Sequence, residues 1–425
     1  MWKTLSIEVA TPVFSSAGTP GEEHLDTRPE IRVSSLRGGM RFWLRAMAAA
    51  YVGDDLHRLR EVEDRVMGST GHSSPIKMRI PRQPEPSEQE LRKLLEDRDQ
   101  RQWIGYLLGP GLTTKGQPTT KDFIPPGRVF PLKVRCDGKE QEDLDAYRCA
   151  LAALWLSLTY GGVGSRIRRG FGGLKIVGAE EGLPWESGSS LMTTPGLEHY
   201  TRAEGLLFTG PAAECRPSLR RICADVLKKN PDSLREHDWR EEPVAPFPVL
   251  GEEHTQARID GGWRASSWQQ VLAKAGEELR YFRAEVDADT QGRYSPPVKT
   301  KGWLDVVHDR RKREKRLPMA ALGLPLVYKD SYEVRVTRPS DGGRGVEQMR
   351  RASPLWLRAV GSKNQWRLFS FAFYSEFLPE SDDVRVNLWK GKQEGRELEV
   401  TTDDAHALTQ SWIEEIGEGK SFIRR

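Results

Sequence analysis

The chain has 425 residues, with 65 Lys and Arg against 61 Asp and Glu, and a formal net charge of +4. This length allows two or three domains, and the nearly balanced charge excludes a protein that is cationic over its whole surface. The basic residues are mostly arginine, 45 against 20 lysines. Guanidinium groups bind phosphate through paired hydrogen bonds and stack on bases. A membrane surface would suit the charge equally, but no basic amphipathic helix with a bulky apolar face stands out.

The cysteines and apolar segments indicate a cytoplasmic protein. The start of the chain has a strand-like pattern and not that of a secretory leader. The longest apolar stretch, 149–160, is too short to span a bilayer. The four cysteines form no C-x-x-C pair, so we expect reduced thiols and neither disulfides nor a zinc site. We therefore expect no metal, no cofactor and no membrane partner.

The first 180 residues are predicted to form one domain. Residues 4–10 alternate apolar and polar side chains, as a half-buried strand does. Residues 144–160 carry apolar side chains along one helical face, and Ser34 and Ser35 are candidate N-caps of an earlier helix. The predicted strands are 4–10, 74–80, 128–136 and 174–177, and the predicted helices are 36–51 and 144–160. The order βαββαβ is that of a ferredoxin-like (RRM-like) domain.

Residues 81–127 interrupt this pattern as an insertion. Ser87 with Glu90 has the spacing of a capping box at the start of a charged helix. Glycine and proline clusters at 109–111 and 125–127 then indicate loops. The insertion either contacts a partner or covers the surface.

Residues 181–196 are predicted to be a linker to a second, less regular domain over 197–425. There we expect helices over 268–282, capped by Ser267, and over 404–416, and strands over 332–336, 353–360, 366–377 and 384–389. Ser74-Pro75-Ile76-Lys77-Met78-Arg79 resembles Ser353-Pro354-Leu355-Trp356-Leu357-Arg358. The matching places of the two segments favour a duplicated domain over coincidence.

The most distinctive motif is the glycine-rich loop over 162–173, with sequence GVGSRIRRGFGG. Glycine permits positive φ and close approach of a ligand to the backbone, and three arginines fill the middle of the loop. The loop lacks G-K-[ST], and its spacing does not fit a dinucleotide fingerprint. A helix C-cap with a bulged turn would explain the first glycines but not Arg166, Arg168 and Arg169.

A second basic feature lies on the helix over 36–51. Arg37, Arg41 and Arg45 are four residues apart and share one face. No carboxylate occurs between Val33 and Val52, although acidic side chains suit a helix N-terminus. Either an anion lies nearby or the arginines form a solvated face.

Further basic residues lie in the second half. Six of the seven residues from Arg310 to Arg316 are cationic, and Lys301 precedes them. Charge runs of this kind are usually solvated, but they also suit a strip that follows phosphates. Arg350 and Arg351 come just before the second copy of the repeated segment.

Catalytic motifs are absent: the sequence has no G-x-S-x-G, H-E-x-x-H or paired-carboxylate pattern. His24 and Asp26 lie in an expected loop after the first strand. Either residue could act in the active site of a nuclease, but most histidines and aspartates in loops have no catalytic role.

Together these motifs resemble the RAMP superfamily of CRISPR-associated proteins, whose hallmark is a glycine-rich loop near the end of a ferredoxin-like domain. Gly162, Gly164, Gly170 and Gly172 match that loop. Residues 33–45, VSSLRGGMRFWLR, are similar to the arginine helix of the first Cmr subunit of type III-B effector complexes. Segments 11–14 (TPVF), 68–70 (GST) and 351–355 (RASPL) resemble further signatures of that family.

The resemblance implies an α+β fold with two tandem ferredoxin-like domains and helical insertions. The second domain would be degenerate, because residues 197–425 have no clear glycine-rich loop or final strand. It also implies a non-catalytic subunit that binds CRISPR RNA and single-stranded target RNA beside other RAMP subunits. This subunit would cap the filament near the 3′ end of the guide, in antiviral defence. The RNA-binding candidates are Arg37, Arg41, Arg45, Gly162, Gly164, Arg166, Arg168, Arg169, Gly170, Gly172, Lys301, Arg310, Arg311, Arg350 and Arg351.

Two alternatives stay open. A RAMP endoribonuclease would process precursor CRISPR RNA with His24 as its general base, and Asp26 occupies the loop in which related backbone subunits carry a cutting aspartate. A scaffold protein would contact only other subunits.

Overall fold

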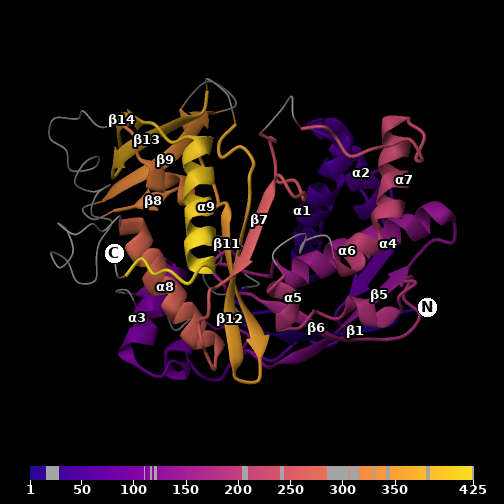
Figure 1. Cartoon of the computed structure of the whole chain (residues 1–425), viewed down its shortest axis with the longest axis horizontal. Coiled ribbons are helices and arrows are strands. Elements are labelled where there is room, and N and C mark those ends of the chain that lie inside the picture. Colours follow the sequence, from indigo (N-terminus) through magenta and orange to yellow (C-terminus); the bar gives the residue numbers. More distant parts are fainter. Residues whose placement is uncertain are drawn as a thin grey trace.

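The computed structural model describes residues 1–15, 28–109, 111–114, 117–118, 122–202, 209–239, 244–284, 306, 315–328, 331–340, 345–379 and 383–423. Its elements form several antiparallel sheets with helices packed against them (Figure 1). The predicted α+β class is confirmed. Among the described residues, no helix combines the length and apolar character needed to cross a membrane.

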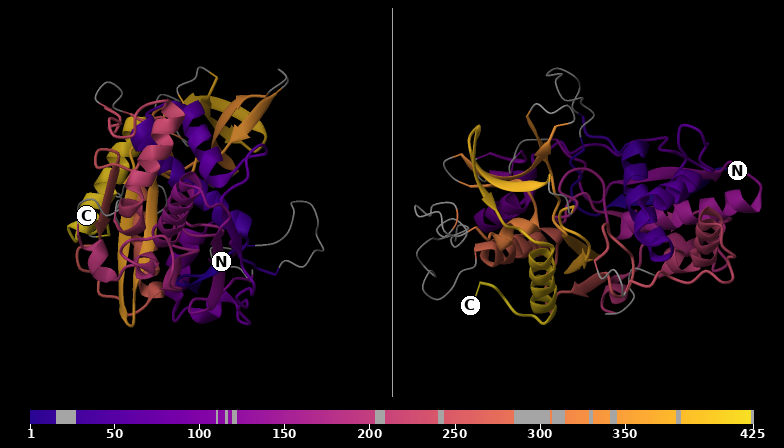
Figure 2. Two further views of the ribbon diagram at one scale, coloured as in Figure 1. Left: turned by 90° about the vertical axis from the view of Figure 1, so that its right-hand side faces the viewer. Right: turned by 90° about the horizontal axis from the view of Figure 1, so that it is seen from above.

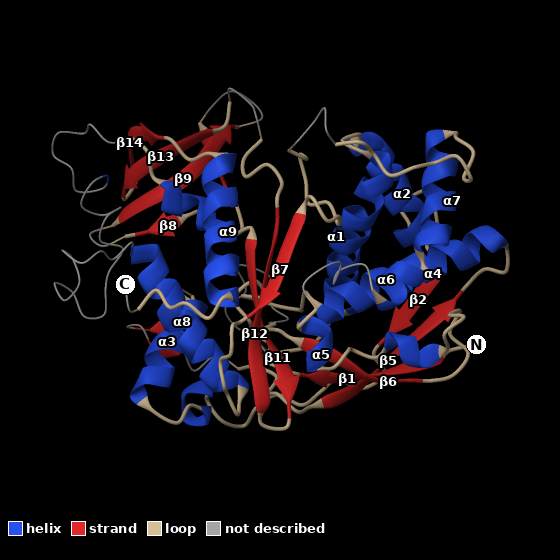
Figure 3. Ribbon diagram, viewed as in Figure 1, coloured by secondary structure: helices blue, strands red, loops and turns tan. Residues whose placement is uncertain are grey.

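The first sheet has the predicted ferredoxin-like strand order. Its strands are β1 (Lys3–Val9), β2 (Ile76–Arg79), β5 (Val129–Cys136) and β6 (Leu174–Ala179). They run in the order β2-β5-β1-β6, and every neighbouring pair is antiparallel. Helices α1 (Val33–Val52) and α4 (Gln141–Thr159) contact each other over this sheet (Figure 3). Alternation along β1 buries Leu5, Ile7 and Val9 beneath the helices.

Helix α1 begins earlier than the sequence predicts. Its N-cap is Arg32, and no side chain caps it. Ser34 and Ser35 already lie inside the first turn, so their expected capping role is wrong. A further helix that the sequence analysis did not predict is α2 (Leu56–Met67), which packs on α1 and begins after the capping carboxylate of Asp55.

The insertion has a different helix from the one expected. It contains η1 (Leu91–Leu94), α3 (Arg98–Leu108), β3 (Thr113–Thr114) and β4 (Gln117–Pro118). The Ser87 hydroxyl accepts a hydrogen bond from the amide of Gln89 and stays in a turn, so the predicted capping box is wrong. Helix α3 starts instead at Asp97, whose carboxylate accepts from the Gln100 amide at 2.7 Å.

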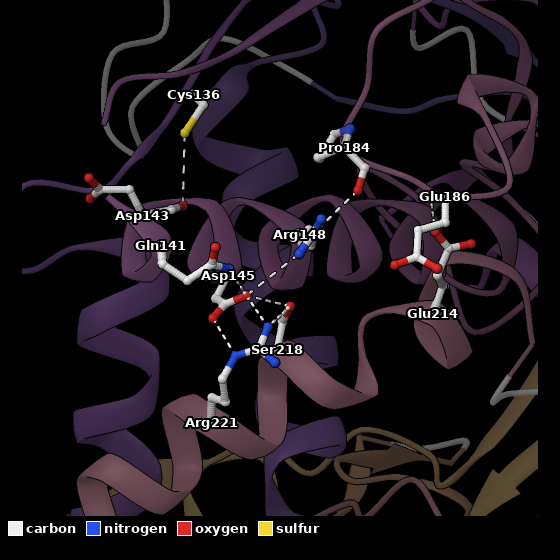
Figure 4. Close-up of polar contacts among 10 residues, drawn as sticks. All are labelled: Cys136, Gln141, Asp143, Asp145, Arg148, Pro184, Glu186, Glu214, Ser218 and Arg221. Carbon is white, nitrogen blue, oxygen red and sulfur yellow. Dashed lines mark hydrogen bonds and ion pairs between the residues drawn. The ribbon is translucent and has the colours of Figure 1, made fainter. Parts of the chain in front are cut away.

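The segment after β6 packs against the first domain. It forms η2 (Ser189–Met192), α5 (Leu197–Tyr200), α6 (Gly210–Glu214) and α7 (Arg216–Leu227). Asp145 on α4 accepts hydrogen bonds from the Ser218 hydroxyl at 2.7 Å and from Arg221 Nε at 2.7 Å (Figure 4). Burial by itself would raise the pKa of Asp145, but these hydrogen bonds hold it below its ordinary value.

The division of the chain into two domains, with a linker over residues 181–196, stays a prediction.

The second half repeats most of the first architecture. Its strands β7 (Thr255–Ile259), β11 (Leu355–Ser362) and β12 (Gln365–Phe373) form a sheet in the order β11-β12-β7. Helices α8 (Trp268–Ala284) and α9 (Thr402–Gly417) pack on these strands. This arrangement matches three of the four strands of a ferredoxin-like unit and both of its helices. The two repeated sequence segments fall on β2 and β11, the equivalent edge strands.

A separate sheet is inserted into this second unit. It consists of β8 (Leu326–Val327), β9 (Tyr332–Pro339), β10 (Val346–Met349), β13 (Arg385–Lys390) and β14 (Gln393–Leu398), preceded by η5 (Pro318–Leu322). Figures 1 and 2 show β7, β11 and β12 between this sheet and the first sheet. One buried cluster joins the two halves, because Phe42 and Trp43 of α1 pack against Trp356 and Phe371.

Candidate nucleic-acid interface

The glycine-rich loop, residues 162–173, is held in place by the segment that follows β1. The amide of Gly172 donates to the carbonyl of Pro12 at 2.9 Å, and the amide of Ser165 donates to the carbonyl of Phe14 at 2.8 Å. The Thr11 hydroxyl accepts from the amide of Gly173 at 2.8 Å. The TPVF segment, residues 11–14, therefore positions the glycine-rich loop through these hydrogen bonds.

The loop glycines are required by the packing of the protein itself. A Cβ on Gly162 would lie 2.5 Å from the Gly172 carbonyl oxygen, and a Cβ on Gly164 would lie 2.5 Å from that of Phe14. Gly164 and Gly172 also have φ of +89° and +70°, which side chains rarely adopt. A Cβ on Gly170 would collide with Leu272 of α8. These glycines shape the loop, and their contact with RNA stays a prediction.

Arg168 ties the loop to the second half of the chain. Its guanidinium donates to the carbonyl of Ser353 and lies 4.6 Å from the ring centroid of Trp356. Its own carbonyl accepts from the amide of Leu357 at 3.2 Å. Burial, together with the neighbouring charge of Arg351, lowers the pKa of Arg168 to about 10.

The structure brings the loop arginines and Arg350 and Arg351 together, as one basic surface. Arg166 and Arg350 are both exposed residues, and partial burial of the Arg166 guanidinium and then the charge of Arg350 lower the pKa of Arg166. Arg351 donates to the carbonyl of Glu376 and lies over the Phe377 ring. We call Arg166, Arg168, Arg169, Arg350 and Arg351 the loop cluster.

Positive charge accumulates in the loop cluster, where the nearby charge of Glu376 partly offsets that of Arg351. Burial and the charges of Arg283 and Arg166 lower the pKa of Arg169 to about 10. Within the part of the chain that the structure describes, no ion pair joins Arg168, Arg169 or Arg350 to a carboxylate. Like charges gathered in this way favour an anionic ligand.

The arginines of α1 have partners within the protein. Arg37 donates to the carbonyl of Met67, and Arg41 donates to that of Gly68 at 3.1 Å. Arg41 also pairs with Glu63 at 2.5 Å, and Arg45 lies 3.5 Å from the same carboxylate. These carbonyls form the negative end of α2, where cations are stabilised. Glu63 of α2 thus supplies a carboxylate for Arg41, whereas Arg37 is bonded to carbonyl oxygens and has no anionic partner among the described residues.

The loop cluster is connected to α1 through Trp356, on a side of the helix next to the one that carries Arg41. Arg41 is directed at α2, whereas Phe42, the next residue, packs against Trp356 at 5.7 Å between ring centroids. The ring of Trp356 in turn makes a cation–π contact with the guanidinium of Arg168. Contact of one RNA strand with both arginine sets stays a prediction. Among Arg37, Arg41 and Arg45, the most accessible side chain is that of Arg45, which is 49% exposed.

Replacing Arg41 with alanine is expected to lower the free energy of unfolding by about 1–3 kcal/mol, because the buried Glu63 and the Gly68 carbonyl lose their donor. Urea denaturation measures this change. The matched control is Arg45→Ala, which removes a more exposed and more distant partner of Glu63 and should cost less than about 1 kcal/mol. Equal costs for the two variants would contradict this account of Arg41.

Several sequence candidates lie outside the described residues, namely Lys301, Arg310, Arg311, His24 and Asp26. Their roles stay predictions. In the described part of the chain, no group of three or more His, Cys, Asp or Glu residues could hold a metal ion.

Two arginines beside the loop were missed by the sequence interpretation. Arg283 lies in the last turn of α8, near Arg169. Arg358 on β11 is only 6% exposed and donates to the carbonyls of Leu158 at 2.6 Å, Leu174 at 2.7 Å, and Gly161. The signal for Arg358 was its place at the end of the repeated segment, whereas nothing in the sequence placed Arg283 beside the loop.

Comparison with known proteins supports one family. The RAMP superfamily model matches residues 6–175. The CRISPR system Cmr subunit Cmr1-1 of Pyrococcus furiosus is 33% identical over 367 residues, which cover 85% of this chain and 86% of that protein. Cmr subunit Cmr1-2 of the same organism is 28% identical over 184 residues, covering 40% of this chain and 92% of that protein.

A solved structure shows the same fold. The apo crystal structure of Cmr1 from Pyrococcus furiosus matches this chain with a TM-score of 0.54 and 19% sequence identity, over 97% of each chain. The sequence relationship to Cmr1-1 extends over most of both proteins. The chain therefore belongs to the Cmr1 family of the RAMP superfamily.

Proposed function

We propose that the chain is a non-catalytic, RNA-binding subunit of a type III-B Cmr effector complex in antiviral defence. It binds CRISPR RNA and single-stranded target RNA beside other Cmr subunits and caps the assembly near the 3′ end of the guide. Membership of the Cmr1 family supports the place in such a complex, because its relative Cmr1-1 is a CRISPR system Cmr subunit.

The observation that carries RNA binding is the loop cluster. Arginines from residues 166–169 and 350–351, far apart in the chain, lie close together around the glycine-rich loop. Guanidinium groups suit phosphate oxygens, and Trp356 holds Arg168 in place. Affinity is expected to come from the sugar-phosphate backbone and to fall with salt, while base edges are left to guide-target pairing.

A single assay separates this function from the alternatives. The purified full chain is incubated with end-labelled single-stranded RNA containing a CRISPR repeat, with and without Mg²⁺, and both filter retention and RNA length are measured. We expect retention of intact RNA under both conditions. Cleavage that is lost in His24→Ala would establish the endoribonuclease instead, and absence of retention at moderate salt would favour the scaffold protein.

A further inference from the structure

Helix α3 of the insertion and helix α8 of the second half form a wall beside the glycine-rich loop. The two helices pack closely, since a Cβ on Gly276 of α8 would collide with the carbonyl of Trp103 on α3. The loop reaches the same wall, where Gly170 lies against Leu272. Figure 1 shows α3 and α8 side by side at one end of the molecule. The insertion therefore contributes to the surroundings of the loop.

Cations from both sides meet at this junction. Arg169 of the loop lies close enough to Arg283 and Arg166 for their charges to add to the effect of burial on its pKa. Arg280, one turn before Arg283 on α8, has its guanidinium 5.1 Å from the ring centroid of Tyr106 on α3. Arg166 extends to the end of α3, where its Nη2 would lie 3.4 Å from a Cβ on Gly109.

Two polar groups at the junction have no acceptor or donor in the described structure. The Tyr106 hydroxyl and Arg283 Nε are both shielded from solvent and make no hydrogen bond there. A buried polar group left in this condition costs about 1–3 kcal/mol, and native structures keep few of them. An oxygen-rich ligand would satisfy both groups.

The two acidic residues of α8, Glu277 and Glu278, do not supply that oxygen. Glu278 accepts from the Ser421 hydroxyl at 2.8 Å and from the Phe422 amide at 2.7 Å. Burial raises the pKa of Glu277, and the charges of Glu278 and Asp99 raise it further. Within the described residues, no ion pair joins a carboxylate to Arg169 or Arg283.

We propose that Tyr106, Arg169 and Arg283 form a phosphate-binding site for the RNA backbone, the junction site, at the meeting of α3, the glycine-rich loop and α8. This inference rests on the proposed function and deepens it. The path of the RNA would extend from the loop cluster toward the end of α8. The insertion would then be part of the RNA interface and not a surface decoration.

The test uses the full chain and a single-stranded RNA of fixed length. The equilibrium dissociation constant is measured by filter binding over a series of salt concentrations. Arg283→Gln is expected to weaken binding about tenfold, as the loss of a charge-assisted hydrogen bond does. It should also reduce the slope of log affinity against log salt by about 0.7, the value for one phosphate of a single strand. Tyr106→Phe should weaken binding about threefold without changing the slope, because it removes a neutral donor.

Two further variants make the result interpretable. Arg283→Lys keeps the charge and is expected to restore the salt slope of the wild type. Arg235→Gln removes a charge from the segment after α7, where the side chain donates to the nearby carbonyl of Asp232, and should change neither quantity. Thermal unfolding of each variant checks that it is folded.

The outcomes distinguish this inference from the function on which it rests. Wild-type affinity and slope in Arg283→Gln and Tyr106→Phe would overturn the junction site while leaving the loop cluster intact. A slope in Arg283→Lys as low as in Arg283→Gln would show a packing role and would also overturn it. Absence of RNA binding by the wild type would remove the proposed function itself.

Discussion

Replacing Arg166 and Arg350 together with glutamine is expected to weaken single-stranded RNA binding about a hundredfold. Both residues are exposed in the loop cluster, and partial burial of the Arg166 guanidinium and then the charge of Arg350 lower the pKa of Arg166. Loss of two charged hydrogen-bonding groups should cost about 3 kcal/mol of binding free energy or slightly less, and the salt slope should fall by about 1.4. Filter binding over a salt series measures both quantities.

The matched control for this pair is Lys229→Gln with Arg235→Gln. Both residues are exposed after α7, and their replacement removes the same net charge. Neither pair should change the free energy of unfolding by more than about 1 kcal/mol, because surface substitutions are usually small in effect. A loss of affinity equal in the two pairs would show that net charge alone, and not the loop cluster, attracts RNA.

Replacing Arg358 with methionine is expected to lower the free energy of unfolding by about 2–4 kcal/mol. This buried guanidinium on β11 donates to the carbonyls of Gly161, Leu158 and Leu174 in the first half. Each carbonyl would lose a donor in a place without water. The change is measured by denaturation in urea, with a constant slope of free energy against urea as evidence that only stability has changed.

The control for Arg358 comes from the repeated segment itself. Arg79 ends the first copy of the segment on β2, where it is exposed and lies 4.5 Å from the ring centroid of Trp2. Arg79→Met should cost less than about 1 kcal/mol, as an exposed contact of a cation with an aromatic ring does. If both variants cost the same, Arg358 does not join the two halves in the manner described.

The four strands of the first sheet and helices α1 and α4 could be predicted from the sequence because their patterns are local. Alternation along β1 and the apolar face of α4 each appear within one short segment. The second half was harder to predict because a separate sheet, β8 to β10 with β13 and β14, is inserted into its ferredoxin-like unit. Helix α2 was missed although Leu59, Val62 and Val66 have helical spacing.

The partners of charged residues could not be predicted, because they depend on tertiary contacts. Helix α1 has no carboxylate of its own, and its arginine Arg41 instead pairs with Glu63, which lies on the neighbouring helix α2. Likewise, spacing in the sequence gave no reason to place Arg283 near Arg169. The sequence did indicate which segments are basic, and the pairing of the loop with residues 350–351 follows from the packing of β11 beside it.

Binding of RNA by the loop cluster is tested most directly by mapping where RNA contacts the full chain. Single-stranded RNA containing 4-thiouridine is bound to the protein, crosslinked by ultraviolet light, and located by mass spectrometry of the attached peptides. We predict attachment within residues 162–173 and 350–357. Attachment confined to the first sheet near Trp2 and Arg135, with none in those two segments, would contradict the claim that the loop cluster binds RNA.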